Sequence, residues 1–237
     1  GPGDLAGVRM VVSAGGTREP IDAVRVIANR SSGKQGYAIA EVAARRGADV
    51  VLVSTVDRPA PNGVRVVAVE TAAQMQAAID AEYPTTDVVV MAAAVADFRP
   101  VDPAGNKIKK EGGIPTIVLE PTPDILAGLG ARKRPGQVLV GFAAETDDLL
   151  ANAARKIEAK RLDLIVANDV SAPGVGFEHD TNAVLMLTAS GRESEHGLSD
   201  KRAIARALLD LVVEERAGAD RRAGRAPQIP SQEHTPT

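Results

Sequence analysis

The chain has 237 residues, of which 44% are hydrophobic and 25% are charged, as in a globular protein with one α/β domain or two small ones. Its net charge of −3 and its lack of Trp argue against attraction to nucleic acid or anionic lipid and against base stacking along a strand. The absence of Cys excludes disulfides, thiolate metal sites and thiol nucleophiles. No apolar run reaches about 18 residues and no charged-then-apolar leader opens the chain, so we expect no membrane span, and a cytoplasmic setting is compatible.

Apolar runs and amphipathic stretches alternate along the chain. The apolar runs predict strands at Val8–Ser13, Ala48–Ser54, Val64–Val69, Asp87–Ala92, Gln137–Phe142, Leu162–Ala167 and Ala183–Leu187. The amphipathic stretches predict helices at Lys34–Arg46, Thr71–Tyr83, Thr122–Arg132, Asp147–Lys160 and Ser199–Arg216. We expect four of these helices to be capped, by Ser31 or Ser32, Thr71, Thr122 and Ser199, with Pro123 in the first turn of the helix that begins at Thr122.

This order predicts a Rossmann-like, doubly wound and mostly parallel sheet with helices on both faces. Residues 93–113 lack a clear period and are rich in Pro, Gly and Lys, so we expect an extended arm, with Ile114–Leu119 as an edge strand or part of a flap. We expect residues 1–7 to be a linker or an expression remnant, 8–216 a single domain, and 217–237 a disordered tail. Ligands of such sheets bind beyond the carboxyl ends of the strands.

The connection after the first strand is much longer than an ordinary strand-to-helix loop of about 2–6 residues. It contains Gly and hydroxyl side chains, two Arg and one Asn, which suit an oxyanion or an amide, and the helix start after it is a ready anion site. A Gly-rich turn without a ligand, and an Asx turn at Asn29, are the structural alternatives. The candidate substrate contacts are Gly15, Thr17, Arg18, Asn29, Ser31, Ser32 and Gly33.

Three further groups suit phosphates. Small residues after the fourth strand allow a ligand close to the backbone, and Asp97 at their end suits Mg²⁺ or a ribose hydroxyl. Lys107 and its neighbours are point-charge phosphate binders on the expected arm. Lys156 and Lys160 are one helical turn apart, and like charges there cost a few tenths of a kcal/mol, which suggests that an anion or acid offsets them. Solvated side chains and local caps are the alternative in each case.

Six motifs together resemble phosphopantothenoylcysteine synthetase, which in bacteria is the C-terminal half of a bifunctional coenzyme A biosynthesis flavoprotein. They are Ala14–Arg25, Asn29–Gly36, Ala92–Phe98, Lys107–Lys110, Gly141–Thr146 and Ala167–Val170. The resemblance covers about residues 8–213 and implies a ligase that joins 4′-phosphopantothenate to L-cysteine with CTP and Mg²⁺ through an acyl-cytidylate. It also implies a homodimer and fusion to a flavin-dependent decarboxylase domain that has no counterpart in this chain, so no flavin is expected here.

The resemblance also assigns roles. It implies that Asn29 contacts the acyl-nucleotide, that Lys107 serves the phosphates and activation, and that Asp97 contacts Mg²⁺. It places the CTP site at Met91, Ala92, Ala93, Asp97, Lys107, Pro123, Asp124, Ile125, Leu126, Phe142, Lys156 and Lys160.

Two other functions remain as alternatives. An NAD(P)-dependent Rossmann oxidoreductase is disfavoured because the sequence has neither a G-x-G-x-x-G turn nor a Tyr-x-x-x-Lys pair. A non-catalytic nucleotide-sensing module would need no catalytic geometry at Asn29 or Lys107.

Overall fold

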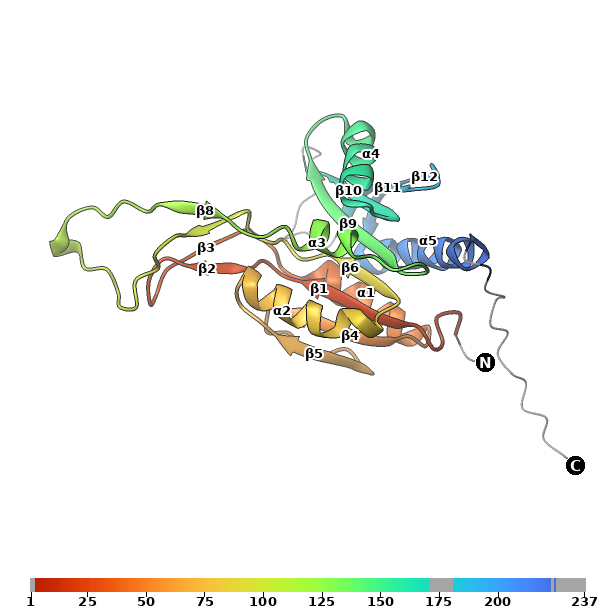
Figure 1. The fold of residues 1–237 in the computed structure, drawn as a ribbon, viewed down its shortest axis with the longest axis horizontal. Coiled ribbons are helices and arrows are strands. Elements are labelled where there is room, and N and C mark those ends of the chain that lie inside the picture. The colour runs from red at the N-terminus through yellow and green to blue at the C-terminus, as the bar shows by residue number, and fades with distance from the viewer. Residues whose placement is uncertain (1–2, 171–180, 223, 225–237) are drawn as a thin grey trace, which may run out of the picture.

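A computed structural model describes residues 3–170, 181–222 and 224. Its main sheet has the strand order β12-β11-β10-β9-β6-β1-β4-β5 (Figure 1). The six strands from β10 to β5 are parallel, and β11 and β12 continue the sheet antiparallel. The strands of this sheet are β1 (Arg9–Ala14), β4 (Asp49–Ser54), β5 (Val64–Ala68), β6 (Val88–Met91), β9 (Val138–Glu145), β10 (Leu164–Asp169), β11 (Thr181–Thr188) and β12 (Glu193–Asp200).

The predicted Rossmann-like, doubly wound fold is confirmed. In chain order, the parallel strands follow the 3-2-1-4-5-6 arrangement of dinucleotide-binding folds, and the order reverses between β1 and β6. Helices cover both faces because alternate residues of each buried strand face opposite sides: Met10 and Val12 lie in one core cluster and Val11 in the other. The first cluster contains residues of α1 (Lys34–Arg45) and α5 (Lys201–Arg222). The second contains residues of α2 (Ala72–Glu82), α3 (Ile125–Ala131) and α4 (Leu149–Lys160).

One of the predicted helix caps is confirmed. The Thr71 hydroxyl accepts from the Gln74 amide at the start of α2, and the Gln74 side chain accepts from the Thr71 amide, which completes a capping box. A 3₁₀ turn, η1 (Tyr83–Thr85), follows α2 and contains Pro84. The predicted end of this helix at Pro84 therefore holds within one or two residues.

The other predicted caps are wrong. α1 begins after Gly33, which has φ of 73° and no side-chain cap, although the Ser32 hydroxyl accepts from the Lys34 amide at 3.4 Å. α3 is capped by Asp124, whose carboxylate accepts from the Ala127 amide, while Thr122 instead donates to the Ala96 carbonyl. At the start of α5 the Asp200 carboxylate accepts from the Ala203 amide at 2.6 Å. At α3 and α5 an Asp closer to the first helical residue accepts the helix amide instead.

Two short hairpins extend beyond the end of the sheet. The long connection after β1 contains β2 (Arg18–Pro20) paired with β3 (Val26–Ala28). The expected arm contains β7 (Phe98–Pro100) paired with β8 (Leu119–Pro121), and between them lies the 3₁₀ turn η2 (Lys110–Gly112). We call residues 98–121 the arm, and Figure 1 shows it projecting away from the main sheet beside β2 and β3. Residues 114–118 form no strand, so the arm is a flap rather than an edge strand of the sheet.

The ends of the domain differ from the expectation. Leu5 is fully buried in a core cluster and its amide donates to the Arg46 carbonyl, so residues 3–7 belong to the folded unit rather than to a linker. α5 continues to Arg222, six residues beyond the predicted end at Arg216. The remainder of the expected tail, residue 223 and residues 225–237, lies outside the described residues. Within the described ranges, no helix combines the length and the apolar content needed to cross a membrane.

Candidate functional site

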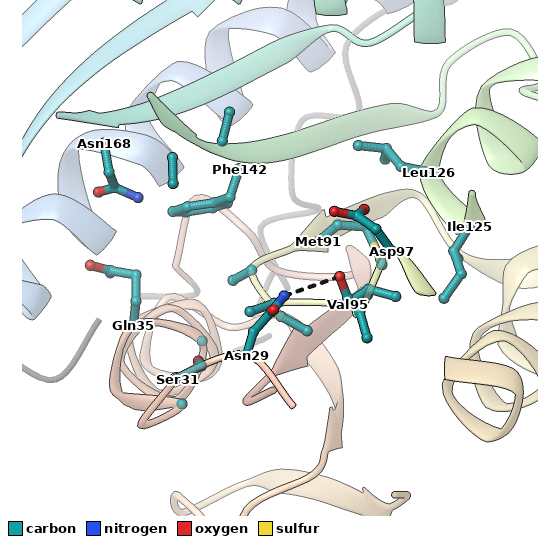
Figure 2. A pocket seen from close by; sticks show the side chains of 18 of the residues that line it. Asn29, Ser31, Gln35, Met91, Val95, Asp97, Ile125, Leu126, Phe142 and Asn168 are labelled. Carbon is teal, nitrogen blue, oxygen red and sulfur yellow. Dashed lines mark hydrogen bonds between the residues drawn. The ribbon is translucent and has the colours of Figure 1, made fainter. Parts of the chain in front are cut away.

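A cavity of about 480 Å³ lies at the carboxyl edge of the sheet, beside the point where the strand order reverses. It is lined by the segment that leads into α1, the segment after β6, the start of α3, and side chains from β9, β10, α4 and α5. Figure 2 shows Gln35 and Asn168 at one end, Ile125 and Leu126 at the other, and Phe142 between them. This is the position predicted for a ligand from the fold class.

The floor of the cavity is made where the loop after β1 pairs with the loop after β6. The Thr17 amide donates to the Ala94 carbonyl at 3.1 Å, and the Ala94 amide donates to the Gly15 carbonyl at 2.9 Å. Two buried hydroxyls complete this pairing: Ser13 accepts from the Ala93 amide at 3.1 Å and Thr17 accepts from the Ala96 amide at 2.8 Å. The two loops therefore hold each other in place. Ser13 was not among the predicted site residues, although it ends the first predicted strand.

Three predicted substrate contacts lie outside the lining of the cavity. Gly15 has φ of 87°, and a Cβ there would lie 2.2 Å from Thr55 Oγ1. Thr17 is fully buried, and the Arg18 guanidinium donates to the Thr55 carbonyl at 2.8 Å. These residues shape the floor and fasten it to the end of β4.

The entrance to α1 does line the cavity, as predicted. Asn29, Ser31, Ser32 and Gly33 are all lining residues. The Asn29 amide donates to the Val95 carbonyl at 3.3 Å, which orients its side chain across the two loops (Figure 2). The first turn of α1 contains no acidic residue, so its positive dipole end is not offset by a carboxylate of its own and favours an anion.

The opposite wall carries two lysines, each paired with a carboxylate from another element. Lys156 Nζ lies 2.6 Å from Glu145 Oε1, and Lys160 Nζ lies 2.9 Å from Asp124 Oδ2. The expectation that an acid offsets these like charges is confirmed. Partial burial acts to raise the pKa of Asp124, but the Ala127 amide and the Lys160 ammonium outweigh it, so this pKa is lowered and the carboxylate stays ionised.

The remaining predicted lining residues are also brought together. The cavity is lined by Met91, Ala92, Ala93, Asp97, Pro123, Asp124, Ile125, Leu126 and Phe142. Asp97 is exposed at the end of the segment after β6. No group of three metal-ligating side chains occurs among the described residues. Mg²⁺ in nucleotide sites is held by one or two carboxylates plus substrate phosphates, so a lone carboxylate at Asp97 fits that mode of binding.

Lys107 lies on the arm and does not line the cavity. Its neighbour Ile108 is fixed to the turn between β2 and β3: the Ile108 amide donates to Asp22 at 3.1 Å, and its carbonyl accepts from Arg25 at 2.8 Å. The structure thus separates the predicted activating lysine from the other predicted nucleotide contacts.

Sequence reasoning missed Gln35 and Lys201 as lining residues. The Gln35 side-chain amide donates to the Lys201 carbonyl at 2.9 Å, which joins the start of α1 to the start of α5. Gln35 belongs to the Asn29–Gly36 motif, so its position was a usable signal. Lys201 lies 166 positions further along the chain, and nothing near it in the sequence indicates a site.

These features define a Rossmann-like protein with a cavity at its switch point, where the entrance of a helix favours an anion. The chain belongs to the family described as "DNA/pantothenate metabolism flavoprotein C-terminal domain", which it matches over residues 5–215. The coenzyme A biosynthesis bifunctional protein CoaBC of Mycobacterium tuberculosis is 48% identical over 229 residues, covering 92% of this chain and 54% of the relative. The chain spans about half the length of the curated CoaBC relatives it matches.

Solved structures agree with this assignment. The crystal structure of the C-terminal domain of a CoaBC protein has a TM-score of 0.78 and 40% identity, covering 91% of this chain and 98% of that chain. A Cab2 H337A mutant in complex with phosphopantothenate-cysteine has a TM-score of 0.75 and 18% identity, covering 92% of this chain and 89% of that chain. At that identity the second likeness supports the fold alone.

Proposed function

We propose that this chain is a ligase that joins 4′-phosphopantothenate to L-cysteine with CTP, as the synthetase domain of coenzyme A biosynthesis. The observation that carries the proposal is the cavity itself. It sets Asn29 and the anion-binding entrance of α1 opposite the Lys156 and Lys160 wall. One end therefore suits an anionic acyl substrate and the other suits a triphosphate. The membership of the family and the name of its CoaBC relatives support the same reaction.

The proposed reaction has two steps. The carboxylate of phosphopantothenate attacks the α-phosphate of CTP, pyrophosphate leaves, and an acyl-cytidylate forms. The cysteine amine then attacks the acyl carbon, CMP leaves, and the amine loses a proton. Both steps develop charge on oxygens, so positioned donors and cations provide the catalysis.

Residues of this chain fit these steps. Lys156 and Lys160 would hold phosphate oxygens, and Asn29 would donate to the acyl oxygen in place of the Val95 carbonyl. Asp97 would hold Mg²⁺, which supplies charge neutralisation on the phosphates. Thr17 and Ser13 would act only through the floor that they fix.

Lys107 would join this site through the arm.

We propose that the arm also forms a homodimer interface. Of the ten exposed large hydrophobic side chains in the described residues, eight lie on the arm or on the β2–β3 hairpin, and Ile114 is 100% exposed. Apolar surface concentrated in this way marks an interaction site. Sedimentation of Ile114→Asp beside the wild type tests the dimer: we expect the variant to be monomeric, and an unchanged dimer would exclude Ile114 from the interface.

The relatives are about twice as long as this chain, which supports fusion to, or association with, a flavin-dependent decarboxylase domain. A cytoplasmic location stays a prediction.

The decisive experiment mixes phosphopantothenate, L-cysteine and Mg²⁺ with a panel of CTP, ATP, GTP and UTP, and measures pyrophosphate. We expect release with CTP that depends on phosphopantothenate. Hydride transfer to NAD(P), or nucleotide binding without turnover, would replace the ligase with one of the two alternatives.

We expect Lys107→Gln to block pyrophosphate release, and Asn29→Asp to slow turnover of the acyl-cytidylate without weakening CTP binding. Wild-type rates in both variants would remove these roles.

A further inference from the structure

Glu145 is half-buried at the carboxyl edge of the sheet, where it pairs with Lys156 of the lysine wall. It is the last residue of β9, and its backbone is fixed by the sheet because the Val170 amide donates to the Glu145 carbonyl at 3.0 Å. Its side chain is only 15% exposed, and it is not among the residues that line the cavity.

Both oxygens of this carboxylate are used by α4. Oε1 accepts from Lys156 Nζ at 2.6 Å, and Oε2 accepts from Asn152 Nδ2 at 3.2 Å. Asn152 and Lys156 are four residues apart and therefore lie on one face of the helix. The two contacts hold the carboxylate against the Lys156 ammonium, and Glu145 itself does not line the cavity.

The two ion pairs of the wall differ in a way that matters for a ligand. Asp124 lines the cavity and its side chain is 49% exposed, so an incoming phosphate meets Asp124 and Lys160 together. Glu145 does not line the cavity, whereas Lys156 does and has a side chain that is 42% exposed. A ligand can therefore reach Lys156 without displacing Glu145.

An ammonium has three donors, and Glu145 takes one of them. The lysine stem is flexible, and an anion that binds a free lysine must also immobilise it. A carboxylate fixed to the end of a strand removes that cost in advance. It also leaves two donors of Lys156, which lines the cavity, for a ligand.

We propose that Glu145 is a positioning residue that holds Lys156 ready for a phosphate group of the substrate. This inference rests on the proposed function only in that the phosphate belongs to a nucleoside triphosphate. For phosphate binding after removal of the Glu145 charge, it predicts the opposite of what simple charge repulsion would give. A negative charge near the site should repel a phosphate, so its removal should tighten binding if Glu145 were only a counterion.

The test is a double-mutant cycle read by calorimetric binding of CTP with Mg²⁺, and separately of inorganic triphosphate, without the other substrates. We expect Glu145→Gln to weaken binding of both probes about tenfold in the wild-type background and not at all in the Lys156→Gln background. Glu145→Asp keeps the charge but is one methylene shorter, so we expect it to weaken binding as well. Glu82→Gln is the matched control, because Glu82 pairs with Arg65 at 2.7 Å away from the cavity, and we expect no change.

Other outcomes overturn the inference. Tighter binding by Glu145→Gln, or binding equal to the wild type by Glu145→Asp, would show that Glu145 is only a counterion of Lys156. An equal loss in both backgrounds would show that Glu145 acts on the fold and not through Lys156. If the wild type binds neither probe, phosphate does not bind at the wall formed by Lys156 and Lys160. If the wild type binds CTP but releases no pyrophosphate once phosphopantothenate and L-cysteine are added, the ligase is refuted and the role of Glu145 stays intact.

Discussion

The buried hydroxyl of Thr17 gives a sharp test of how the cavity floor is held. In Thr17→Val the side chain keeps its volume, but the Ala96 amide loses the acceptor that it contacts at 2.8 Å. Thr17 is 0% exposed and Ala96 is 3% exposed, so water cannot replace the lost contact. A buried donor left without a partner costs roughly 1–3 kcal/mol. For a domain of this size about 2 kcal/mol corresponds to a fall in Tm of about 4–8 °C.

Thr17→Ser is the matched control, because it keeps the hydroxyl and removes only a methyl group. Urea unfolding should show a large loss of stability in Thr17→Val and a small one in Thr17→Ser. Ala94–Asp97 line the cavity, so we also expect the KM for CTP to rise in Thr17→Val together with the loss of stability. An unfolding midpoint equal to that of the wild type would refute the structural role. A higher KM without any loss of stability would instead show that Thr17 contacts the ligand.

Two further predictions concern other parts of the scaffold. Hydrogen bonding to Arg25 lowers the pKa of Asp22 against the opposing effect of burial, so its stabilisation is fully present above the ordinary value of 3.8 and is lost as the pH falls below it. Asp22→Asn should therefore be less stable than the wild type at pH 7, and the gap in urea midpoint should narrow toward pH 3; a constant gap would contradict this. A Cβ at Gly36 would lie 2.6 Å from Ala14 Cβ, about 1 Å inside the normal separation of carbon atoms. Gly36→Val should lower stability by about 1–3 kcal/mol through displacement of α1 from β1, whereas Gly128→Ala, where the added Cβ meets nothing within 4 Å, should not; equal thermal unfolding of both variants would refute the close packing.

The sheet was predictable because its signal is local. Buried parallel strands are apolar throughout, and short apolar runs separated by amphipathic stretches indicate them without knowledge of their partners. β12 was missed for the same reason: Glu193–Asp200 is polar and contains Gly197, and it forms a strand only because β11 offers its backbone. A pattern in the sequence cannot show a neighbour of that kind.

The helix caps show the same difference between a local signal and one that depends on the rest of the fold. The Thr71 cap depends on residues three positions apart, and the sequence contained both. The expected caps at Thr122 and Ser199 failed because another residue nearby, Asp124 or Asp200, receives the helix amide instead. Residue type limits which residues can cap a helix. The path of the chain before the helix decides which of them does so.

For the site, the sequence by itself determined which segments meet, because the carboxyl ends of parallel strands share one edge of the sheet. It also identified Asn29, Asp97, Lys156 and Lys160, and the family resemblance added Phe142; all five line the cavity. The tertiary structure alone decided which polar groups face the cavity and which support it. Thr17 and Arg18 contact backbone groups from other loops, and Glu145 contacts α4, so their roles depend on what the fold places opposite them. A side chain's chemistry is local, but its partner is chosen by packing between segments far apart in the chain.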